Sequence, residues 1–336
     1  MSHPAIVSTA SLATPWRGAD PFLFMAHHLD LYPQADGELA PKSALDGRQI
    51  GSDFANKDGW NMYHGERVPG FPAHPHRGFE TITIVTEGFV DHADSLGGKA
   101  RYGMGDVQWL TAGGGIMHSE MFPLLHADRA NTLNLAQIWL NLPAAGKMVP
   151  AHFSMFWNED IPVVSAAEGV SVKVIAGRYD DAQALPPPPG SWASRPQADI
   201  AIWLLRLPAG AAWALPAAKA GLSRSLHLLT GSALDIDGFA LSARHLAELK
   251  SDAALTVRNA GEGDALVLLL QARPIGEPVA SYGPFVMNTP QQIQQAFVDF
   301  QRTRFGDWPF PDAAPTHGQV AERFAVYPGG EMSRPA

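Results

Sequence analysis

Two pairs of side chains in the first half of the chain have the types and spacing of metal ligands. The stretch "HPH" places His74 and His76 one residue apart, and "HSE" places His118 and Glu120 at the same spacing. Residues i and i+2 of an extended strand face the same side, so each pair projects from one face. Two such pairs on neighbouring strands of a closed barrel can converge on one point.

Three neutral imidazoles and one carboxylate form a nitrogen and oxygen donor set that suits a divalent transition metal and leaves positions for water or substrate. Iron(II) is the favoured ion, with manganese, nickel, copper and zinc as alternatives. The chain has no cysteine, so any metal must bind to His, Asp or Glu. A lone His-x-His is more often a surface pair, and it is the second pair that favours a metal site.

The turn before His118 has two compatible interpretations. Gly113 to Gly115 form a triple-glycine segment, which is typical of an ordinary tight turn that needs positive φ. The same turn would bring His118 and Glu120 to the mouth of a barrel beside the first pair.

The elements that must position these residues are predicted to be strands. The 32 glycines and 28 prolines cut the sequence into short segments rich in β-branched and aromatic residues, which is typical of an all-β fold. The predicted strands are Phe79–Glu87, Val107–Thr111, Gln137–Leu142, Val170–Ile175, Ile200–Leu207, Ser225–Leu229, Leu255–Asn259 and Ala265–Gln271.

One segment, "NTPQQIQQAFVDFQRTRFG", predicts a helix. Thr289 can act as the N-cap, with Pro290 in the first helical position and Gln292 completing a capping box. An apolar stripe that should dock on a barrel follows at helical spacing: Ile293, Phe297 and Phe300.

The length of 336 residues favours two domains. We expect an N-terminal metal-binding barrel over residues 1–160, a C-terminal barrel without metal over 161–288, and a helix and tail over 289–336. Four consecutive prolines within residues 184–197 predict a connector, because proline cannot donate to a strand ladder. Residues 31–59 lack clear periodicity and are predicted to form a long surface loop.

Charge and hydropathy exclude several classes of partner. The net charge is −9 without a cluster of Lys or Arg, which argues against direct binding to nucleic acid. The N-terminal stretch lacks the pattern of a secretory signal, and the apolar runs fall short of the roughly 18 to 20 residues of a membrane span. Together with the lack of cysteine, this predicts a cytoplasmic location.

Four sequence blocks resemble the signature blocks of the pirin family, within the cupin superfamily. The blocks are "HPHRGFET" at 74–81, "GDVQWLTAGGGIMHSEM" at 105–121, "IWLNLP" at 138–143 and "YGPFVMNT" at 282–289. The resemblance implies a bicupin of two β-barrels (double-stranded β-helix or jelly-roll), with a single mononuclear iron site in the N-terminal barrel. Its ligands correspond to His74, His76, His118 and Glu120. The C-terminal half has no His-x-His, and "AWALPAAKAG" at 212–221 stands where its ligand-bearing strand would be.

The sequence departs from the family pattern at two places. Pirins usually have arginine where this chain has Gly114, so a positive charge near the site is lost. Residues 36–59 resemble an insertion that could reshape the pocket entrance. Glu80 is a rival carboxylate, because general cupins often take a ligand from that place; in a pirin-like chain we expect it to support the site indirectly.

The resemblance implies two main functions. Some pirin-like proteins are similar in activity to quercetin 2,3-dioxygenases, which cleave a flavonol with O₂ and release carbon monoxide; Glu120 would then accept the hydroxyl proton. The alternative is a metal- or redox-sensing regulatory protein that binds a protein partner without catalysis, and a metal-dependent isomerase is a third class. A dioxygenase needs a partly apolar pocket, for which the candidates are Phe71, Phe79, Met104, Trp109, Met117 and Phe122.

Overall fold

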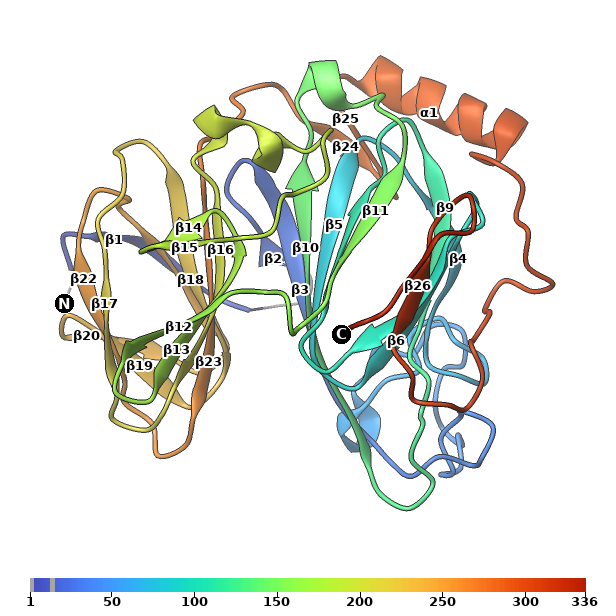
Figure 1. Ribbon diagram of the computed structural model, residues 1–336, viewed down its shortest axis with the longest axis horizontal. Helices are drawn as coiled ribbons and strands as arrows, with labels where there is room; N and C mark the ends of the chain where they lie inside the picture. Colours follow the sequence, from blue (N-terminus) through green and yellow to red (C-terminus); the bar gives the residue numbers. More distant parts are fainter. Residues whose placement is uncertain (1–2, 13–15) are drawn as a thin grey trace. The chain divides into compact units, whose positions relative to one another are not determined.

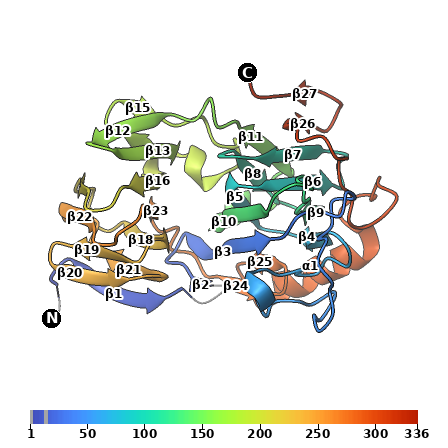
Figure 2. The ribbon, with the colours of Figure 1, turned by 90° about the horizontal axis from the view of Figure 1, so that it is seen from below.

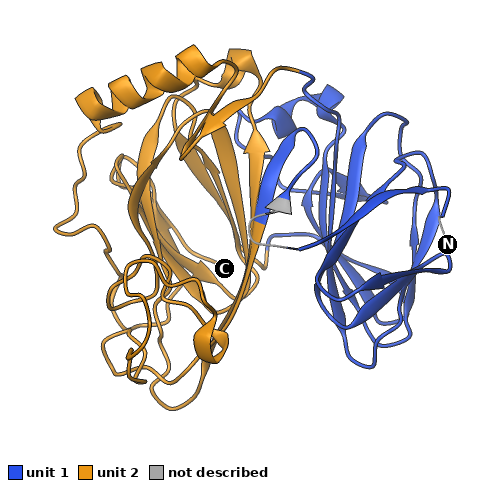
Figure 3. Ribbon diagram, turned by 180° about the vertical axis from the view of Figure 1, so that it is seen from behind, with its two compact units in different colours: residues 1–25, 160–276 blue, residues 26–159, 277–336 orange. Residues whose placement is uncertain are grey.

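The computed structural model describes residues 3–12 and 16–336, and within them it is built mostly from strands, with one α-helix (Figure 1). The chain forms two compact units (Figure 3). Unit 1 contains the described residues up to Met25 together with Asp160–Gly276. Unit 2 contains Ala26–Glu159 and Glu277–Ala336. No helix of the described residues is long and apolar enough to span a membrane.

The two units do not follow the expected division into 1–160, 161–288 and 289–336. The N-terminal segment belongs to the unit that contains most of the C-terminal half, and the C-terminal segment belongs to the unit that contains most of the N-terminal half. Strand β1 (Ile6–Ser11) pairs antiparallel with β21 (His245–Leu249) of unit 1. Strand β26 (Phe324–Val326), near the other end, pairs antiparallel with β7 (Lys99–Gly103) of unit 2. Each terminal strand therefore completes a sheet whose other strands are far away in sequence. Both strands are short and partly exposed, so neither has a hydrophobic pattern that would reveal its partner.

Unit 1 consists chiefly of two antiparallel sheets; two of its strands, β14 and β15, pair in a separate two-stranded sheet, and β2 pairs with the first residues of β3 (Phe22–Tyr32). The larger sheet has the order β1-β21-β18-β23-β16-β13-β12, which Figure 2 shows as a ladder of strands, and the smaller has the order β17-β22-β19-β20. Its remaining strands are β2 (Trp16–Arg17), β12 (Val163–Ala167), β13 (Val170–Ala176), β14 (Arg178–Tyr179), β15 (Ala182–Gln183), β16 (Ala201–Leu207), β17 (Ala212–Leu215), β18 (Ser223–Thr230), β19 (Ala233–Ile236), β20 (Phe239–Ser242), β22 (Leu255–Asn259) and β23 (Ala265–Ala272).

The core of unit 1 is apolar and follows the two-residue period of its strands. Alternate residues of the large sheet point into one buried cluster, as Trp203 and Leu205 do on β16 and Leu226 and Leu228 do on β18. Facing positions of the small sheet, such as Trp213, join the same cluster. The hydrophobic alternation of these strands is what encloses a core between the two sheets.

Unit 2 also consists chiefly of two antiparallel sheets, with the orders β11-β8-β5-β10-β3 and β27-β26-β7-β6-β9-β4. Its strands and helix are β3 (Phe22–Tyr32), β4 (Gly70–His76), β5 (Phe79–Glu87), β6 (Phe89–Asp94), β8 (Val107–Thr111), β9 (Ile116–Met121), β10 (Asn131–Asn141), β11 (His152–Phe156), β24 (Ala280–Tyr282), β25 (Phe285–Met287), α1 (Pro290–Thr303) and β27 (Met332–Ser333). Strand β3 begins at the end of unit 1 and continues into unit 2.

The predicted elements largely match those of the structure. Three predicted strands have the same bounds as β5, β8 and β22, and four others agree with β13, β16, β18 and β23 to within two residues at each end. The predicted strand Gln137–Leu142 covers only the second half of β10. The helix is confirmed, with Thr289 and Gln292 forming the capping box and its apolar stripe packed on Phe285 of β25.

Two predictions about the chain between the strands need comment. The proline-rich segment 184–197 is not a connector between units, because it lies inside unit 1, where the short 3-10 helices η3 (Trp192–Ser194) and η4 (Pro196–Ala198) follow the prolines. The predicted loop 31–59 is mostly irregular and ends in the 3-10 helix η1 (Lys57–Gly59). Its first two residues, Leu31 and Tyr32, instead end a strand, and the loop is not merely superficial. The guanidinium of Arg48 is buried there, paired with Asp53 at 2.9 Å and stacked on Trp60.

Candidate metal centre

The four predicted ligands come from two adjacent strands of one sheet in unit 2. Strand β9 runs antiparallel between β4 and β6. His74 of β4 lies directly opposite His118 of β9, and a bulge between Phe71 and His74 adjusts the register of the pair. The sequence therefore builds the site from one cross-strand pair, with His76 and Glu120 each two residues further along its strand.

Three imidazoles are gathered into one cluster. The ring nitrogens of His74, His76 and His118 that could bind a metal all lie within 4.8 Å of one another. The ring centroids are 4.5 Å apart for His74 and His118, 4.7 Å for His74 and His76, and 4.9 Å for His76 and His118. Within residues 3–12 and 16–336 this is the one group of three or more His, Cys, Asp or Glu side chains close enough to hold a metal ion.

The hydrogen bonds of the cluster leave nitrogen lone pairs free for a metal. Nδ1 of His74 lies 2.9 Å from the carbonyl oxygen of Pro72, and Nδ1 of His76 makes a longer contact of 3.4 Å with the carbonyl of Pro284. An Nδ1–H that donates to a carbonyl leaves Nε2 as the ligand atom. Both ring nitrogens of His118 are buried without a hydrogen-bond partner. A buried polar ring without a partner is costly, and a metal ion would satisfy one of these two nitrogens.

Burial keeps all three imidazoles neutral. It lowers the pKa of His74 to about 4 and the pKa values of His76 and His118 well below the usual range, and the neighbouring imidazoles lower the last two further. Neutral imidazole is the form that binds a metal. The cluster is thus deprotonated and ready for a cation at neutral pH.

Glu120 lies beside the cluster rather than within it. Its Oε2 is 3.9 Å from Nε2 of His118. The amide Nε2 of Gln137 donates to both carboxylate oxygens, at 2.9 and 3.0 Å, and the hydroxyl of Thr83 makes a weaker contact at 3.4 Å. Burial raises the pKa of Glu120 and outweighs the opposing effect of the bond from Gln137. The carboxylate is therefore held in place but poorly solvated.

Gln137 is a site residue that the sequence analysis missed. It lies on β10, and its Oε1 accepts a hydrogen bond from Nε1 of Trp139, two residues along the same strand. Trp139 in turn stacks on Phe79 and packs its ring edge-on against His76, with centroids 5.1 Å apart. The available signal was an amide two residues before a tryptophan on the same strand, a spacing that places both side chains on one face.

Glu80, the rival carboxylate, is occupied elsewhere. It is fully buried on β5, in the other sheet of unit 2, and Oε1 accepts a hydrogen bond of 2.7 Å from the hydroxyl of Thr111 on the neighbouring strand β8. It does not belong to the histidine cluster. Its position agrees with an indirect role.

A fourth histidine lies on β6, the strand next to β9 in the same sheet. On β6, His92 lies opposite Glu120 and Asp94 lies opposite His118. Nε2 of His92 is 2.9 Å from the carboxylate of Asp94, and the rings of His92 and His118 are 5.6 Å apart. Asp94 also accepts hydrogen bonds from the backbone N–H groups of Leu96 and Gly98. These bonds hold the end of β6 in place, and β6 pairs directly with β9.

The triple-glycine turn has the conformation that was predicted, at two of its three positions. Gly113 and Gly115 have φ of +49° and +134°, whereas Gly114 does not have positive φ. The carbonyl of Gly114 accepts a hydrogen bond of 2.7 Å from Nε of Arg77, whose guanidinium pairs with Asp299 and lies over the ring of Phe305. The turn before His118 is thus tied to the helix α1.

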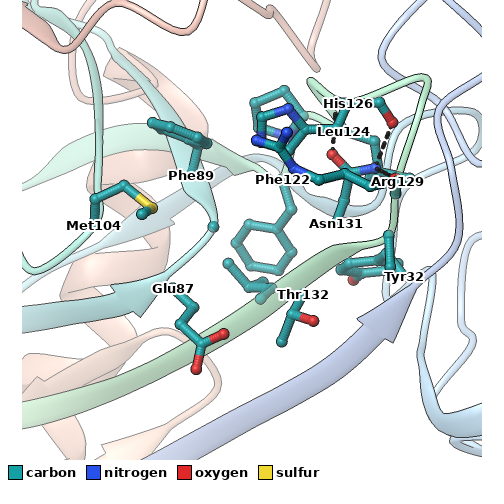
Figure 4. A pocket seen from close by; sticks show the side chains of 14 residues that line it. Tyr32, Glu87, Phe89, Met104, Phe122, Leu124, His126, Arg129, Asn131 and Thr132 are labelled. Atoms are coloured by element: carbon teal, nitrogen blue, oxygen red, sulfur yellow. Dashed lines mark hydrogen bonds between the residues drawn. The ribbon is translucent and has the colours of Figure 1, made fainter.

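The six candidate pocket residues do not form one pocket. Phe71 and Phe79 lie next to the cluster, with ring centroids 6.3 Å from His74 and 5.0 Å from His76. Met104 and Phe122 instead line a separate cavity of about 230 Å³, which Figure 4 shows with Tyr32, His126 and Arg129 around it. None of the three clustered histidines lines that cavity. Trp109 is fully buried in the core.

The described part of the C-terminal half carries no comparable cluster. His227 is buried on β18, within hydrogen-bond distance of Ser225, and His245 is bonded to the backbone carbonyl of Ala243. The stretch 212–221 begins with the short strand β17 and then becomes irregular.

Family models and relatives agree with this two-part architecture. The model described as Pirin matches residues 41–140, and the model described as Pirin C-terminal cupin domain matches residues 202–306. A Pseudomonas aeruginosa protein provisionally named quercetin 2,3-dioxygenase is 40% identical over 237 residues, covering 70% of this chain and 79% of that protein. A pirin-like protein of Caulobacter vibrioides is 40% identical over 249 residues, covering 73% and 84%.

A solved structure is similar over most of the chain. The crystal structure of quercetin 2,3-dioxygenase from Acinetobacter baumannii has a TM-score of 0.70 and 26% sequence identity, and the match covers 90% of this chain and 98% of that one. The chain, which is mostly β with one helix, therefore contains two cupin domains. With its paired histidines in the first of them, the chain belongs to the pirin family.

Proposed function

We propose that the protein is a metal-dependent dioxygenase that cleaves a flavonol with O₂ and releases carbon monoxide, as quercetin 2,3-dioxygenases do. The observation that carries the proposal is the cluster of His74, His76 and His118, three neutral imidazoles within 4.8 Å of one another. The names of the Pseudomonas relative and of the Acinetobacter structure support the choice of substrate class. The flat aromatic rings of a flavonol suit the aromatic side chains beside the cluster, Phe71, Phe79 and Trp139.

The residues fit one divalent transition metal. Three imidazoles favour such an ion, and the partnerless nitrogens of buried His118 require something to bind them. In our proposal Glu120, whose Oε2 lies 3.9 Å from Nε2 of His118, is the fourth ligand. Iron(II) is the ion we favour, and manganese, nickel, copper or zinc would fit the same donors. When bound, such a metal supplies a Lewis acid and, if redox-active, a path for electrons to O₂.

The chain's own residues would hold the substrate and move its proton. Glu120 would accept the proton of the flavonol 3-hydroxyl, and its raised pKa makes it a stronger base than an ordinary carboxylate. Gln137 would keep the carboxylate oriented by donating to both oxygens. Trp139 and Phe79, stacked on each other beside His76, would form an apolar wall that excludes water.

Turnover of quercetin by metal-loaded protein tests this function. We expect quercetin to be consumed with an equal uptake of O₂ and an equal release of carbon monoxide. The rate should vanish when a chelator removes the metal and return when iron(II) or another divalent ion is added. The matched control is His118→Ala, which removes one imidazole of the cluster and should be inactive under every loading.

A protein that binds one metal tightly and consumes no flavonol under any loading would overturn the proposal. That outcome would favour a metal- or redox-sensing regulatory protein that binds a protein partner. The two functions differ in one measurable respect, because a sensor needs its metal without turning over a substrate.

A further inference from the structure

Unit 1 contains a cavity of about 600 Å³ at one end of its core, formed entirely by its own residues. Three inward positions lie on adjacent strands: Ala201 of β16 pairs with Gln271 of β23, and Gln271 pairs with Arg224 of β18. Arg224 lies two residues from Leu226, and Gln271 lies two residues from Leu269, on the face that forms the core. Polar side chains therefore stand where the apolar core of unit 1 opens.

Three buried polar atoms of residues that line this cavity have no hydrogen-bond partner. They are Nε of Arg224, Nε1 of Trp203 and Oε1 of Gln271, from side chains that are 3%, 5% and 7% exposed. Native proteins seldom leave buried polar atoms unpaired. Three such atoms around one cavity, two of them donors and one an acceptor, point to a ligand with complementary groups.

Arg224 is a buried charge without a carboxylate partner in the described part of the chain. Its Nη1 donates to the backbone carbonyl of Ser251 at 3.1 Å. Within the described residues no carboxylate pairs with it, although burying an unpaired charge is expensive. Burial lowers its pKa only to about 10, so the guanidinium stays protonated at neutral pH.

The rest of the cavity is also positive and partly aromatic. Its lining includes four cationic side chains and two carboxylates: Arg178, Arg195, Lys219, Arg224, Asp180 and Asp199. Asp199 is already paired with Lys219 at 2.5 Å and with Arg273 at 2.8 Å. Tyr179 and Trp203 meet edge to face with centroids 5.0 Å apart and offer an apolar surface at the same cavity.

We propose that this cavity binds a small aromatic carboxylate that carries a hydroxyl group. The carboxylate would accept hydrogen bonds from Arg224 and Trp203, the hydroxyl would donate to Oε1 of Gln271, and the ring would pack against Tyr179. A cavity of about 600 Å³ falls in the usual range for small-molecule sites. The second barrel is thus a binding site for a small molecule, independent of the metal centre and of the activity proposed for it.

Calorimetric titration of the metal-loaded full chain with 4-hydroxybenzoate tests the proposal. The neutral isostere 4-hydroxybenzamide serves as the probe for charge. We expect one equivalent of the carboxylate to bind and the amide to bind at least about tenfold more weakly, since a hydrogen bond to a charged group contributes that much. Equal affinity for acid and amide, or no binding of the acid at millimolar concentration, would overturn the proposal.

Variants locate the bound carboxylate. Arg224→Gln should weaken binding of 4-hydroxybenzoate about tenfold or more. Arg206→Gln, which changes an exposed arginine of the same unit that pairs with Asp264 outside the cavity, should leave it unchanged. If Arg224→Gln does not fold, Trp203→Phe removes a single N–H donor and should weaken binding about threefold to tenfold. Unchanged binding in the folded variants would place the carboxylate elsewhere, for example at the metal, and contradict the proposal.

Discussion

The two barrels of this chain share an architecture of paired antiparallel sheets but differ in what faces inward near the opening of each. In unit 2 the inward positions of β4 and β9 carry His74, His76 and His118, all neutral. In unit 1 the corresponding kind of position on β18 carries Arg224, which is charged and partnerless at Nε. One barrel offers lone pairs to a cation, and the other offers N–H donors to an anion.

The difference teaches that the fold supplies positions, and that the side chains at those positions decide the ligand. Both barrels present an inward row of residues at the end of an apolar core. Imidazoles kept neutral by burial suit a metal, because metal ions bind deprotonated nitrogen. A buried guanidinium repels a metal and attracts a carboxylate.

The largest expected effect separates the barrels by metal content. His118→Ala should abolish tight metal binding, because it removes one of the three imidazoles of the cluster. The wild-type chain should hold one metal per molecule, measured by elemental analysis after purification without chelator. His245→Ala, in unit 1, is the matched control and should keep the full equivalent. Two tightly bound equivalents in the wild type would contradict the contrast between the barrels.

The next effect distinguishes the two carboxylates of unit 2. Glu120→Ala should weaken metal binding by more than about 100-fold if Glu120 is a direct ligand. Glu80→Ala should cost about 10- to 100-fold at most, the usual range for groups that only support the ligands. Gln137→Leu should fall in that same range, because it removes both hydrogen bonds that orient Glu120. Competition with a chelator of known affinity measures all three, and the reverse order for Glu120 and Glu80 would show that Glu80 is the ligand.

Much of the metal-binding barrel could be predicted from the sequence. The His-x-His and His-x-Glu spacings predicted which residues approach one another, since a strand's two-residue period is local information. The capping box of Thr289 and Gln292 predicted the start of the helix for the same reason. The histidine cluster formed as expected, while Glu120 lies beside it at 3.9 Å from His118, a detail that depends on the long-range partner Gln137.

What the sequence could not predict depends on contacts between distant segments. Strand β1 is short and mostly exposed, so its sequence does not indicate a partner. Only its pairing with β21 assigns it to unit 1. Arg224 was not singled out because one arginine in a strand usually faces solvent. Its burial follows from the register of β18 against β23, which no short motif reveals.

The third prediction concerns pH. Because burial lowers the pKa of His74 to about 4 and those of His76 and His118 well below 6.5, protons should not compete for these nitrogens between pH 7 and 5.5. Metal affinity should change less than about tenfold over this range. Three imidazoles with ordinary pKa values would each lose about tenfold at pH 5.5. Metal titrations at several pH values distinguish these cases, and a fall near 1,000-fold would contradict the burial of the cluster.

The lowered pKa values of these histidines also make the stability of the metal-free protein depend on pH. The unfolded chain binds protons on these histidines below about pH 6.5, while the folded chain does not until the pH approaches 4. Their contribution to the free energy of unfolding is therefore complete above pH 6.5 and is lost as the pH falls. For His74 the loss is roughly 2 kcal/mol at pH 5. Denaturant titrations of metal-free protein should show stability falling over this range, and stability that stays constant would argue against neutral, buried imidazoles.

The smallest effect comes from giving the metal-binding barrel a cation of its own. Gly114→Arg restores the residue that the pirin pattern has at this place. The structure accommodates it, because Gly114 does not have positive φ and a Cβ there would meet its nearest neighbour, the carbonyl oxygen of Met148, at 3.5 Å. If the added charge helps to hold an anionic flavonol, KM should fall by up to about fivefold, as for an exposed ion pair. Stability should change by no more than about 0.5 kcal/mol.

The neighbouring glycine provides the control that makes this variant interpretable. Gly115→Ala should destabilise the protein by more than about 1 kcal/mol, because Gly115 has φ of +134° and a Cβ there would lie 2.5 Å from the ring of Phe305. Thermal unfolding of the two variants separates the effect of a side chain at position 114 from damage to the turn. A lower KM for quercetin with unchanged stability in Gly114→Arg would mean that a cation at the opening assists anion binding in this barrel, as we propose for Arg224 in the other. An unchanged KM in a stable Gly114→Arg protein would show that the aromatic wall and the metal hold the substrate without that charge.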